Sequence, residues 1–354
     1  MSDTDAPRPV ALRYVLRVLL YRFGVDRVTD LAAAMTYYLV LSVFPLIVAV
    51  VSIISLVGGA DWLVPRMEEV VASVVAPEVA QAFADVVGGF LESKGAGVAL
   101  TISLVAAIWS ASGYIGAFTR AVNTVYQVGE GRNFAKLKGI QLLMTLAVVL
   151  LIILLVIGLA ISSTVARWLG GLFDMGPQFE AVWAWLRFPT LGVAVVILVQ
   201  LLYFVAPNVR QPRVRILSLG SLVAIVLAFG VVQLFNVYLS AFHGASTYAK
   251  TYGALAGVII VLFLAFLVNI ALVIGAELDA ILERLRQLRF GLPAESGLLL
   301  PPRDAKGIAN TAHTKALLVK RGHSIRAEAL AEGVQPPDWY VTASLNASRD
   351  DSLE

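Results

Sequence analysis

The 354-residue sequence contains no cysteine and only three histidines, His243, His313 and His323. The lack of cysteine excludes disulfides, thiolate nucleophiles and cysteine-ligated metal sites. Charged residues are also scarce, at 14%, whereas 59% of the residues are hydrophobic and the mean hydropathy is +0.83. Soluble domains carry about 25% charged residues. The composition therefore predicts an integral membrane protein.

The net charge of +3 is small, and the basic residues flank apolar segments instead of forming one patch. The positions of the basic residues are therefore better explained by membrane topology than by nucleic-acid binding. The first 30 residues contain five arginines and no small-residue cleavage site after a short apolar core. We therefore expect no removable signal peptide and an N-terminus that stays in the cytoplasm.

Six apolar segments are each about long enough to cross the ~30 Å hydrocarbon core of a bilayer as a helix. They are residues 36–57, 98–117, 140–163, 190–206, 216–240 and 254–278. With these spans, 22 of the 27 Lys and Arg residues fall on one side of the membrane. Since cytoplasmic flanks carry the Lys/Arg excess, the sequence predicts that both termini are cytoplasmic and that the protein lies in a bacterial inner membrane.

The predicted fold is thus an all-α polytopic membrane protein with a membrane domain at residues 31–290. Residues 1–30 precede it, with an interfacial helix over Leu12–Phe23 in which apolar residues oppose arginines. Residues 62–93 have apolar residues at helical spacing but are too charged to span, which predicts an extracytoplasmic amphipathic helical hairpin. From residue 291 to 354 the apolar pattern is lost, and we expect a disordered cytoplasmic tail.

Polar side chains within or at the ends of the spans are the candidate functional residues. They are Gln200, Tyr203, Gln233, Asn236, Asn269 and Glu277. Intramembrane polar residues can line a passage, but they can equally join helices by hydrogen bonds. Glu277 can serve as a gate or proton-linked carboxylate, or form a plain salt bridge with a basic residue such as Arg120. The line of Ser112, Gly116 and Arg120 marks one face of the second span.

No Lys, Arg, Asp or Glu lies deep inside the six spans, which argues against an ion pump or a voltage sensor. Two functional classes remain. One is a transporter or flippase-like protein for an envelope lipid or small solute, which needs a groove lined by the polar residues. The other is a membrane scaffold or assembly factor, in which those residues pack against each other. Neither class needs a cofactor, and the sequence does not fix an oligomeric state.

Several short motifs, in order and in register, carry a resemblance to a known family. Their residues include Tyr37, Tyr38, Ser42, Pro45, Trp109, Ser110, Asn123, Pro207, Asn208, Tyr252, Gly253, Gly275 and Ala276. Over residues 10 to 290 the chain resembles the YihY/virulence factor BrkB family of inner-membrane proteins. Phe263 and Phe266 stand where the family tends to have Trp, and Asp279 where it usually has Asn.

The resemblance implies a multi-pass membrane protein linked to envelope biology. Some family members carry a ribonuclease BN label. Nuclease chemistry usually needs Asp, Glu or His clustered around metal ions. The three histidines here are scattered. We therefore expect no catalytic residues, no metal site and no nucleic-acid partner.

Overall fold

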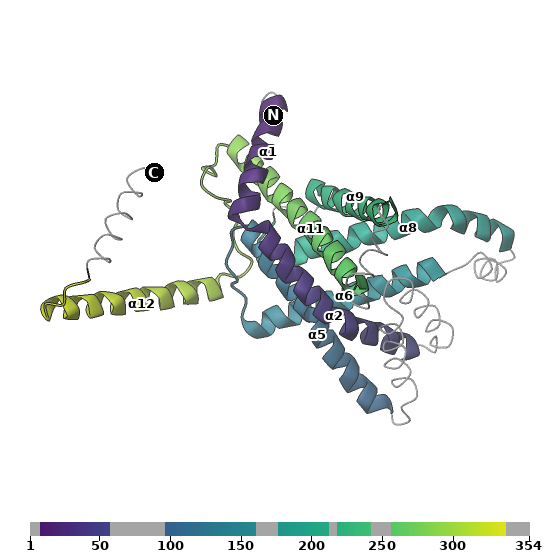
Figure 1. Ribbon diagram of the computed structural model, residues 1–354, viewed down its shortest axis with the longest axis horizontal. Helices are drawn as coiled ribbons and strands as arrows, with labels where there is room; N and C mark the ends of the chain where they lie inside the picture. Colours follow the sequence, from purple (N-terminus) through teal and green to yellow (C-terminus); the bar gives the residue numbers. More distant parts are fainter. Residues whose placement is uncertain (1–7, 57–95, 161–175, 212–217, 242–255, 338–354) are drawn as a thin grey trace. The chain divides into compact units, whose positions relative to one another are not determined.

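The computed structural model describes residues 8–56, 96–160, 176–211, 218–241 and 256–337 (Figure 1). The described helices are α1 (Arg8–Val25), α2 (Val28–Leu56), α5 (Ala96–Val125), α6 (Phe134–Ala160), α8 (Gly176–Val205), α9 (Leu219–Ala241), α11 (Ala256–Arg289) and α12 (Lys306–Ala331). The chain divides into two units, Met1–Arg303 and Asp304–Glu354. The expected hairpin at 62–93, together with Tyr252 and Gly253, lies outside the described residues.

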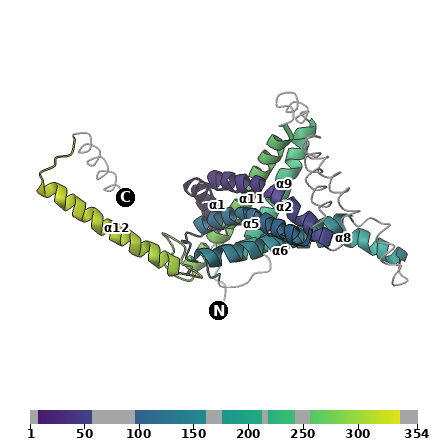
Figure 2. The same ribbon diagram turned by 90° about the horizontal axis from the view of Figure 1, so that it is seen from below.

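Six helices of the first unit form a closed ring. Each contacts the next in the order α2, α5, α6, α8, α9, α11, and α11 contacts α2 again. Figures 1 and 2 show α2 beside α5 and α9 beside α11 in both views. α1 packs on the outside of this ring, against α11 and α2. Each segment expected to span the membrane lies largely on one of the six helices.

Three helices of the described chain have a stretch long and apolar enough to cross a membrane: Phe134–Leu155, Leu219–Tyr238 and Ile259–Arg289. Val28–Ser42 and Pro189–Val205 are shorter apolar helical stretches. The all-helical membrane fold is therefore confirmed, whereas the full set of six spans stays a prediction. Pro45 lies on α2, but its side chain is outside the described residues.

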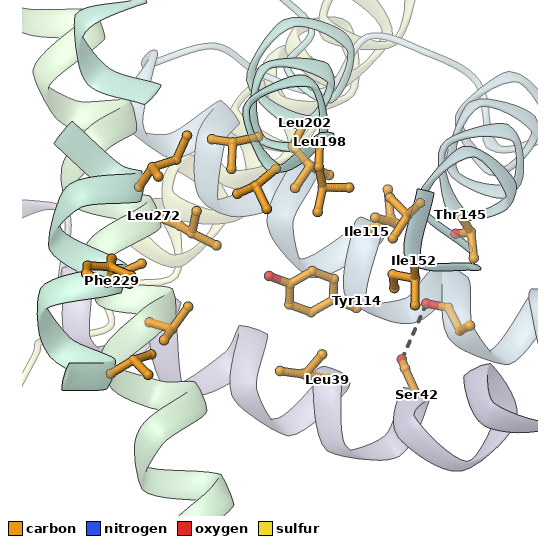
Figure 3. Close-up of a pocket in the computed structure, with 18 of the residues that line it drawn as sticks. Leu39, Ser42, Tyr114, Ile115, Thr145, Ile152, Leu198, Leu202, Phe229 and Leu272 are labelled. Carbon is orange, nitrogen blue, oxygen red and sulfur yellow. Dashed lines mark hydrogen bonds between the residues drawn. The ribbon is translucent and has the colours of Figure 1, made fainter. Parts of the chain in front are cut away.

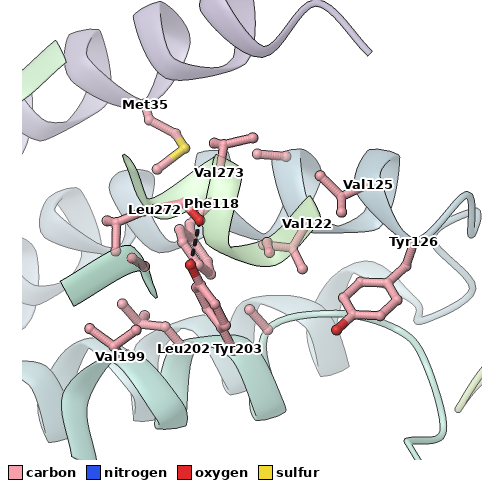
Figure 4. Close-up of a cluster of buried hydrophobic side chains, with 14 of the residues drawn as sticks. Met35, Phe118, Val122, Val125, Tyr126, Val199, Leu202, Tyr203, Leu272 and Val273 are labelled. Carbon is pink, nitrogen blue, oxygen red and sulfur yellow. Dashed lines mark hydrogen bonds between the residues drawn. The ribbon is translucent and has the colours of Figure 1, made fainter. Parts of the chain in front are cut away.

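The buried core lies where α2, α5, α8 and α11 meet (Figure 4). Phe118 and Met35 are fully buried there. The rings of Phe118 and Tyr203 stack with their centroids 6.0 Å apart and their planes at 21°. Burial of a large apolar side chain contributes about 1.5–3 kcal/mol in water.

α9 and α11 cross with their backbones in direct contact, at Gly220 and Gly275. A Cβ atom on Gly275 would lie 2.5 Å from the carbonyl oxygen of Gly220 and 2.6 Å from both the Cβ of Ala224 and the hydroxyl of Tyr203. Small residues permit this close approach between membrane helices. The backbone N–H of Gly220 also donates to Oδ1 of Asp279 at 2.8 Å, so a side chain of α11 caps the first turn of α9.

α8 begins earlier than the sequence predicted. The sequence places the start of the fourth span at residue 190, but the helix begins at Gly176 and continues through Pro189. Proline inside a helix removes one hydrogen bond, and in membrane helices neighbouring groups make this tolerable. The predicted span is thus the second half of a longer helix.

The chain after α11 also differs from the expected disordered tail. Residues up to Arg303 belong to the first unit. Nε of Arg303 donates to the carbonyl of Val209 at 2.8 Å, and an isolated antiparallel bridge joins Val209 to Pro302. Burial and the neighbouring Arg132 lower the pKa of the Arg303 guanidinium from its ordinary value. The second unit contains α12, a 26-residue helix with no buried residue. Its many Ala, Leu, Lys and Arg residues favour a helix even without a core.

Candidate functional site

A cavity of about 610 Å³ lies inside the ring of helices (Figure 3). All six ring helices contribute to its wall. The lining residues include Leu39 from α2, Ile115 from α5, Ile152 from α6, Leu198 and Leu202 from α8, Phe229 from α9 and Leu272 from α11. Ligand pockets typically measure about 300–1,000 Å³ and are mostly apolar. The cavity has the size and character of a site for the apolar part of a ligand.

Among the described lining residues, four polar side chains reach this wall: Ser42, Tyr114, Thr145 and Gln233. The Ser42 hydroxyl donates to the carbonyl of Tyr38 at 2.6 Å, and Thr145 donates to the carbonyl of Gln141 at 2.8 Å. Thr145 thus donates within its own helix, whereas the Ser42 hydroxyl also lies within hydrogen-bond distance of the carbonyl of Ala111 on α5, at 3.3 Å. The Tyr114 ring points into the cavity (Figure 3), and its hydroxyl donates to Oδ1 of Asn269 at 3.0 Å.

Asn269 joins three helices behind the cavity wall. Its amide nitrogen donates to the hydroxyl of Thr36 at 3.0 Å, and its amide oxygen accepts from Tyr114. The side chain is buried. The sequence left two roles open for Asn269, lining a passage or joining helices, and these contacts are of the kind that the second role needs.

The other predicted polar residues are distributed around the ring. Gln233 lines the cavity. The Tyr203 hydroxyl donates to the carbonyl of Leu272, joining α8 to α11. Oε1 of Gln200 accepts from the backbone N–H of Ser218 at 3.4 Å, beside the start of α9. Asn236 lies on an exposed face of α9. Of the six predicted residues, Gln233 is therefore the one that the structure places on the cavity wall.

Glu277 is buried at the contact of α1 with α11. Its Oε2 lies 3.8 Å from Nε of Arg22, whose Nε also lies 3.0 Å from a carboxylate oxygen of Asp26. Arg22 in addition donates to the carbonyl of Val125 at 3.1 Å. Within the described chain neither carboxylate oxygen of Glu277 accepts a hydrogen bond. The expected salt bridge of Glu277 thus exists, but its partner is Arg22 and not Arg120.

The sequence missed the role of Arg22 because its spacing placed it on the polar face of an interfacial helix. In the structure its side chain is 10% exposed and points toward α5 and α11. A helical pattern with arginines at 13, 17 and 22 does not reveal which of them faces the protein. The useful signal was the acid Glu277 on the last span, which requires a buried cation nearby.

The motif residues Asn123 and Asn208 meet in a polar cluster at the loop between α5 and α6. The Asn123 amide nitrogen donates to Glu130 at 3.0 Å, and its oxygen accepts from the backbone N–H of Asn208 at 2.8 Å. Glu130 also accepts two hydrogen bonds from the Arg132 guanidinium, at 2.8 and 2.7 Å. Arg132 then donates to the carbonyl of Ala206, so the cluster ties this loop to the end of α8.

The pKa of Glu130 is set by opposing effects. Burial alone would raise it, but hydrogen bonds from Arg132 and Asn123 and the charge of Arg132 outweigh burial, so the pKa lies below its ordinary value of 4.5. A carboxylate with a lowered pKa in the folded state stabilises the protein above its unfolded pKa. That stabilisation is lost as the pH falls through the lowered, folded-state value.

We therefore expect Glu130→Gln to reduce the free energy of unfolding by about 1–3 kcal/mol at neutral pH, because hydrogen bonds to a charged group are lost. The difference from wild type should shrink as the pH falls below 4.5 and through the lowered pKa of the folded state, below which the acid is neutral in both states of the wild-type protein. Melting of the detergent-solubilised proteins from about pH 3 to about pH 8 measures this difference. A difference in stability that is the same at every pH would contradict a lowered pKa of Glu130 in the folded protein.

The remaining motif residues lie on the outer side of the ring or at helix contacts. Tyr37 is exposed, and Tyr38 packs its ring edge against it at 5.4 Å between centroids. Trp109 is 50% exposed, and Ser110 is exposed too. Ala276 is buried beside Gly275 at the crossing with α9.

The fold and this site define an all-helical membrane protein with an apolar cavity among its helices. The chain belongs to the virulence factor BrkB family, whose model matches residues 19–296. This confirms the resemblance found in the sequence. Within the described ranges no group of three or more His, Asp or Glu side chains is placed to hold a metal ion.

Two curated proteins are similar to the chain over most of their length. The putative ribonuclease-like protein YfkH of Bacillus subtilis (strain 168) is 25% identical over 274 residues, covering 77% of this chain and 96% of that protein. A UPF0761 membrane protein of Aeromonas salmonicida (strain A449) is 26% identical over 269 residues, covering 74% of this chain and 86% of that protein. No solved structure matches the chain.

Proposed function

We propose that this protein binds the apolar part of an envelope lipid or amphipathic solute inside the membrane and moves it across, as a transporter or flippase-like protein. The observation that carries the proposal is the cavity of about 610 Å³ with walls from all six ring helices. Burial of one methylene group contributes about 0.8 kcal/mol. A cavity of this size and apolar lining is able to hold an acyl chain.

The topology that goes with this function has six spans, formed by the ring helices, with both termini in the cytoplasm of a bacterium. The split of basic residues, 22 against 5, supports this orientation. The ring supports the six spans. Helices that cross a membrane in alternating directions place consecutive helices beside one another, and α2, α5, α6, α8, α9 and α11 are arranged in this way. The bilayer is the expected partner, and neither a cofactor nor ribonuclease activity is part of the proposal.

A membrane scaffold is the second candidate function. It is favoured by the bonding of Asn269 and Tyr203, which pair with Thr36, Tyr114 and the backbone of Leu272. Interhelical hydrogen bonds of this kind hold a bundle together without lining a passage. The two candidates differ in whether an occupied cavity is needed, which an experiment on the cavity wall can decide.

Replacing Gly192 by phenylalanine tests the cavity. Gly192 lies on its wall, and a Cβ atom there would meet nothing within 4 Å, so the side chain can enter without a clash. Excluding about two methylene groups of a ligand should weaken its binding about tenfold. Competition between a fluorescent acyl-chain probe and phospholipid on the purified protein measures the binding. Movement of labelled phospholipid across proteoliposomes measures the transport.

Gly230→Phe is the matched control. Gly230 is also a helical glycine at which an added Cβ atom would meet nothing within 4 Å, and it does not line the cavity. We expect this variant to bind the probe and move lipid like wild type. If neither Gly192→Phe nor Gly230→Phe changes probe binding, the cavity is not the binding site. If wild-type protein binds the probe but never speeds lipid movement, the scaffold function takes precedence.

A further inference from the structure

A seam on the outer side of the ring, where α5 meets α2 and α6, carries two cations and two aromatic rings. Trp109, Ser112, Gly116 and Arg120 follow one another along one face of α5. Lys138 and Gln141 of α6 face this line, and Tyr38 of α2 packs against it at Gly113, 3.2 Å from where a Cβ atom would be. None of these side chains takes part in the cavity wall.

Lys138 is held inside the seam by three contacts. Its ammonium donates to the hydroxyl of Ser112, lies 3.4 Å from the carbonyl of Trp109, and sits 4.3 Å from the centre of the Trp109 ring. Gln141, further along α6, lies opposite Gly116. Lys138 is nearer the loop, so it must extend away from the loop to reach Ser112. A lysine that only sought water would extend toward the membrane surface instead.

Arg120 occupies the other end of the seam. Its guanidinium lies over the Tyr38 ring, 5.2 Å from the ring centre. A Cβ atom on Gly116 would be 3.5 Å from Nη1 of Arg120 and 3.3 Å from Nε2 of Gln141. The missing side chain at Gly116 therefore leaves room for the guanidinium to fold back along α5 toward Lys138.

Neither cation has an acidic partner among the described residues. The ion pairs described there involve Arg22, Arg132, Arg286 and Arg321. Arg120 is exposed, and Trp109 is half exposed on the same face. On a membrane helix such an exposed face meets lipid. A charged group next to lipid requires a counter-charge, and basic pockets between membrane helices obtain one from lipid head groups.

We propose that this seam binds the phosphate of an anionic phospholipid, with Lys138 and Arg120 as the charge partners and the Trp109 and Tyr38 rings beside the head group. Ser112 positions Lys138 through its hydroxyl, and Gly116 leaves the space that the head group and Arg120 share. The site lies apart from the cavity, so the proposal stands whether or not the cavity carries a substrate.

The test compares phosphatidylglycerol with phosphatidylcholine of the same acyl chains, added to the purified, delipidated protein. Native mass spectrometry counts bound lipid, and the melting temperature reports its effect on stability. We expect wild type to prefer phosphatidylglycerol. Lys138→Gln and Arg120→Gln should each weaken its binding about fivefold, the effect of one cation near a charged lipid surface. Lys138→Arg keeps the charge and should retain most of the binding.

Lys136→Gln is the matched control, since it removes the same charge from an exposed position on the same helix. An equal loss of binding in this variant would overturn the proposal, because nonspecific attraction between the basic protein and the anionic lipid would then explain the binding. Equal binding of both lipids by wild type would overturn it too, as would stabilisation by inorganic phosphate equal to that by phosphatidylglycerol. Each variant is first melted without lipid. If Lys138→Gln does not fold, Arg120→Gln, at an exposed position, gives the same test.

Discussion

Gly275→Ala is expected to lower the free energy of unfolding by about 3 kcal/mol, near the upper end of the usual cost of overpacking. The added methyl group would lie 2.5 Å from the Gly220 carbonyl oxygen and 2.6 Å from the Ala224 Cβ atom, where no flexible side-chain end can move aside. The α9 and α11 backbones would have to separate. That movement would also break the hydrogen bond from Gly220 to Asp279. Thermal melting of the purified protein in detergent measures the loss.

Gly192→Ala and Gly230→Ala are the controls for this prediction. A Cβ atom at either position meets nothing within 4 Å, so alanine should be neutral or stabilise the helix by up to about 1 kcal/mol. The three variants exchange the same atoms and differ only in surroundings. If Gly275→Ala melts as the two controls do, the close crossing of α9 and α11 is not present in the folded protein.

Arg22→Leu is expected to destabilise the protein by about 3–5 kcal/mol, the usual cost of breaking a buried ion pair by removing one partner. Glu277 is 1% exposed and Asp26 is 9% exposed at the side chain, so neither acid can turn to water when the arginine is gone. The hydrogen bond from Arg22 to the carbonyl of Val125 is lost as well. Melting temperature and the yield of folded protein are the readouts.

The double variant Arg22→Leu with Glu277→Gln should recover part of this loss, because the buried acid is removed together with its partner. Arg17→Leu is the control, since Arg17 lies on the same helix and is exposed. It should melt close to wild type. A double variant no more stable than Arg22→Leu alone would show that the cost arises from lost packing of Arg22 and not from the uncompensated charge of Glu277.

The helices of the ring were largely predictable, because long apolar runs ending in basic residues determine where membrane helices lie. The end of α8 and the start of α9 followed from Pro207 and the arginines after it. The start of α8 did not, because the helix continues through Pro189 and past Trp185 into a region that the sequence marks as a boundary. The α12 helix was missed because the composition of the tail indicates only that this segment cannot form a hydrophobic core. A helix composed of strong helix formers does not need such a core.

The cavity was the part least accessible to sequence reasoning. Polar residues on a span can be found by inspection, and Gln200, Tyr203 and Asn269 are indeed buried or partly buried. Whether they face a cavity or a neighbouring helix depends on how each helix is rotated about its axis. The sequence does not determine this rotation, because the residues that face lipid are apolar as well. The wall is instead made of ordinary Leu, Ile and Val residues, which look the same in sequence as residues that face lipid.

The hydroxyl groups around the cavity have a consequence for selectivity. Ser42, Thr145 and Tyr114 each donate their one hydroxyl hydrogen to a protein oxygen. Of the four polar side chains among the described wall residues, the amide of Gln233 is then the remaining donor for an occupant. A buried acceptor left without a donor costs about 1–3 kcal/mol, as much as about one to four buried methylene groups contribute. The cavity should therefore bind plain hydrocarbon chains more tightly than chains whose ester carbonyls lie inside it without reaching Gln233.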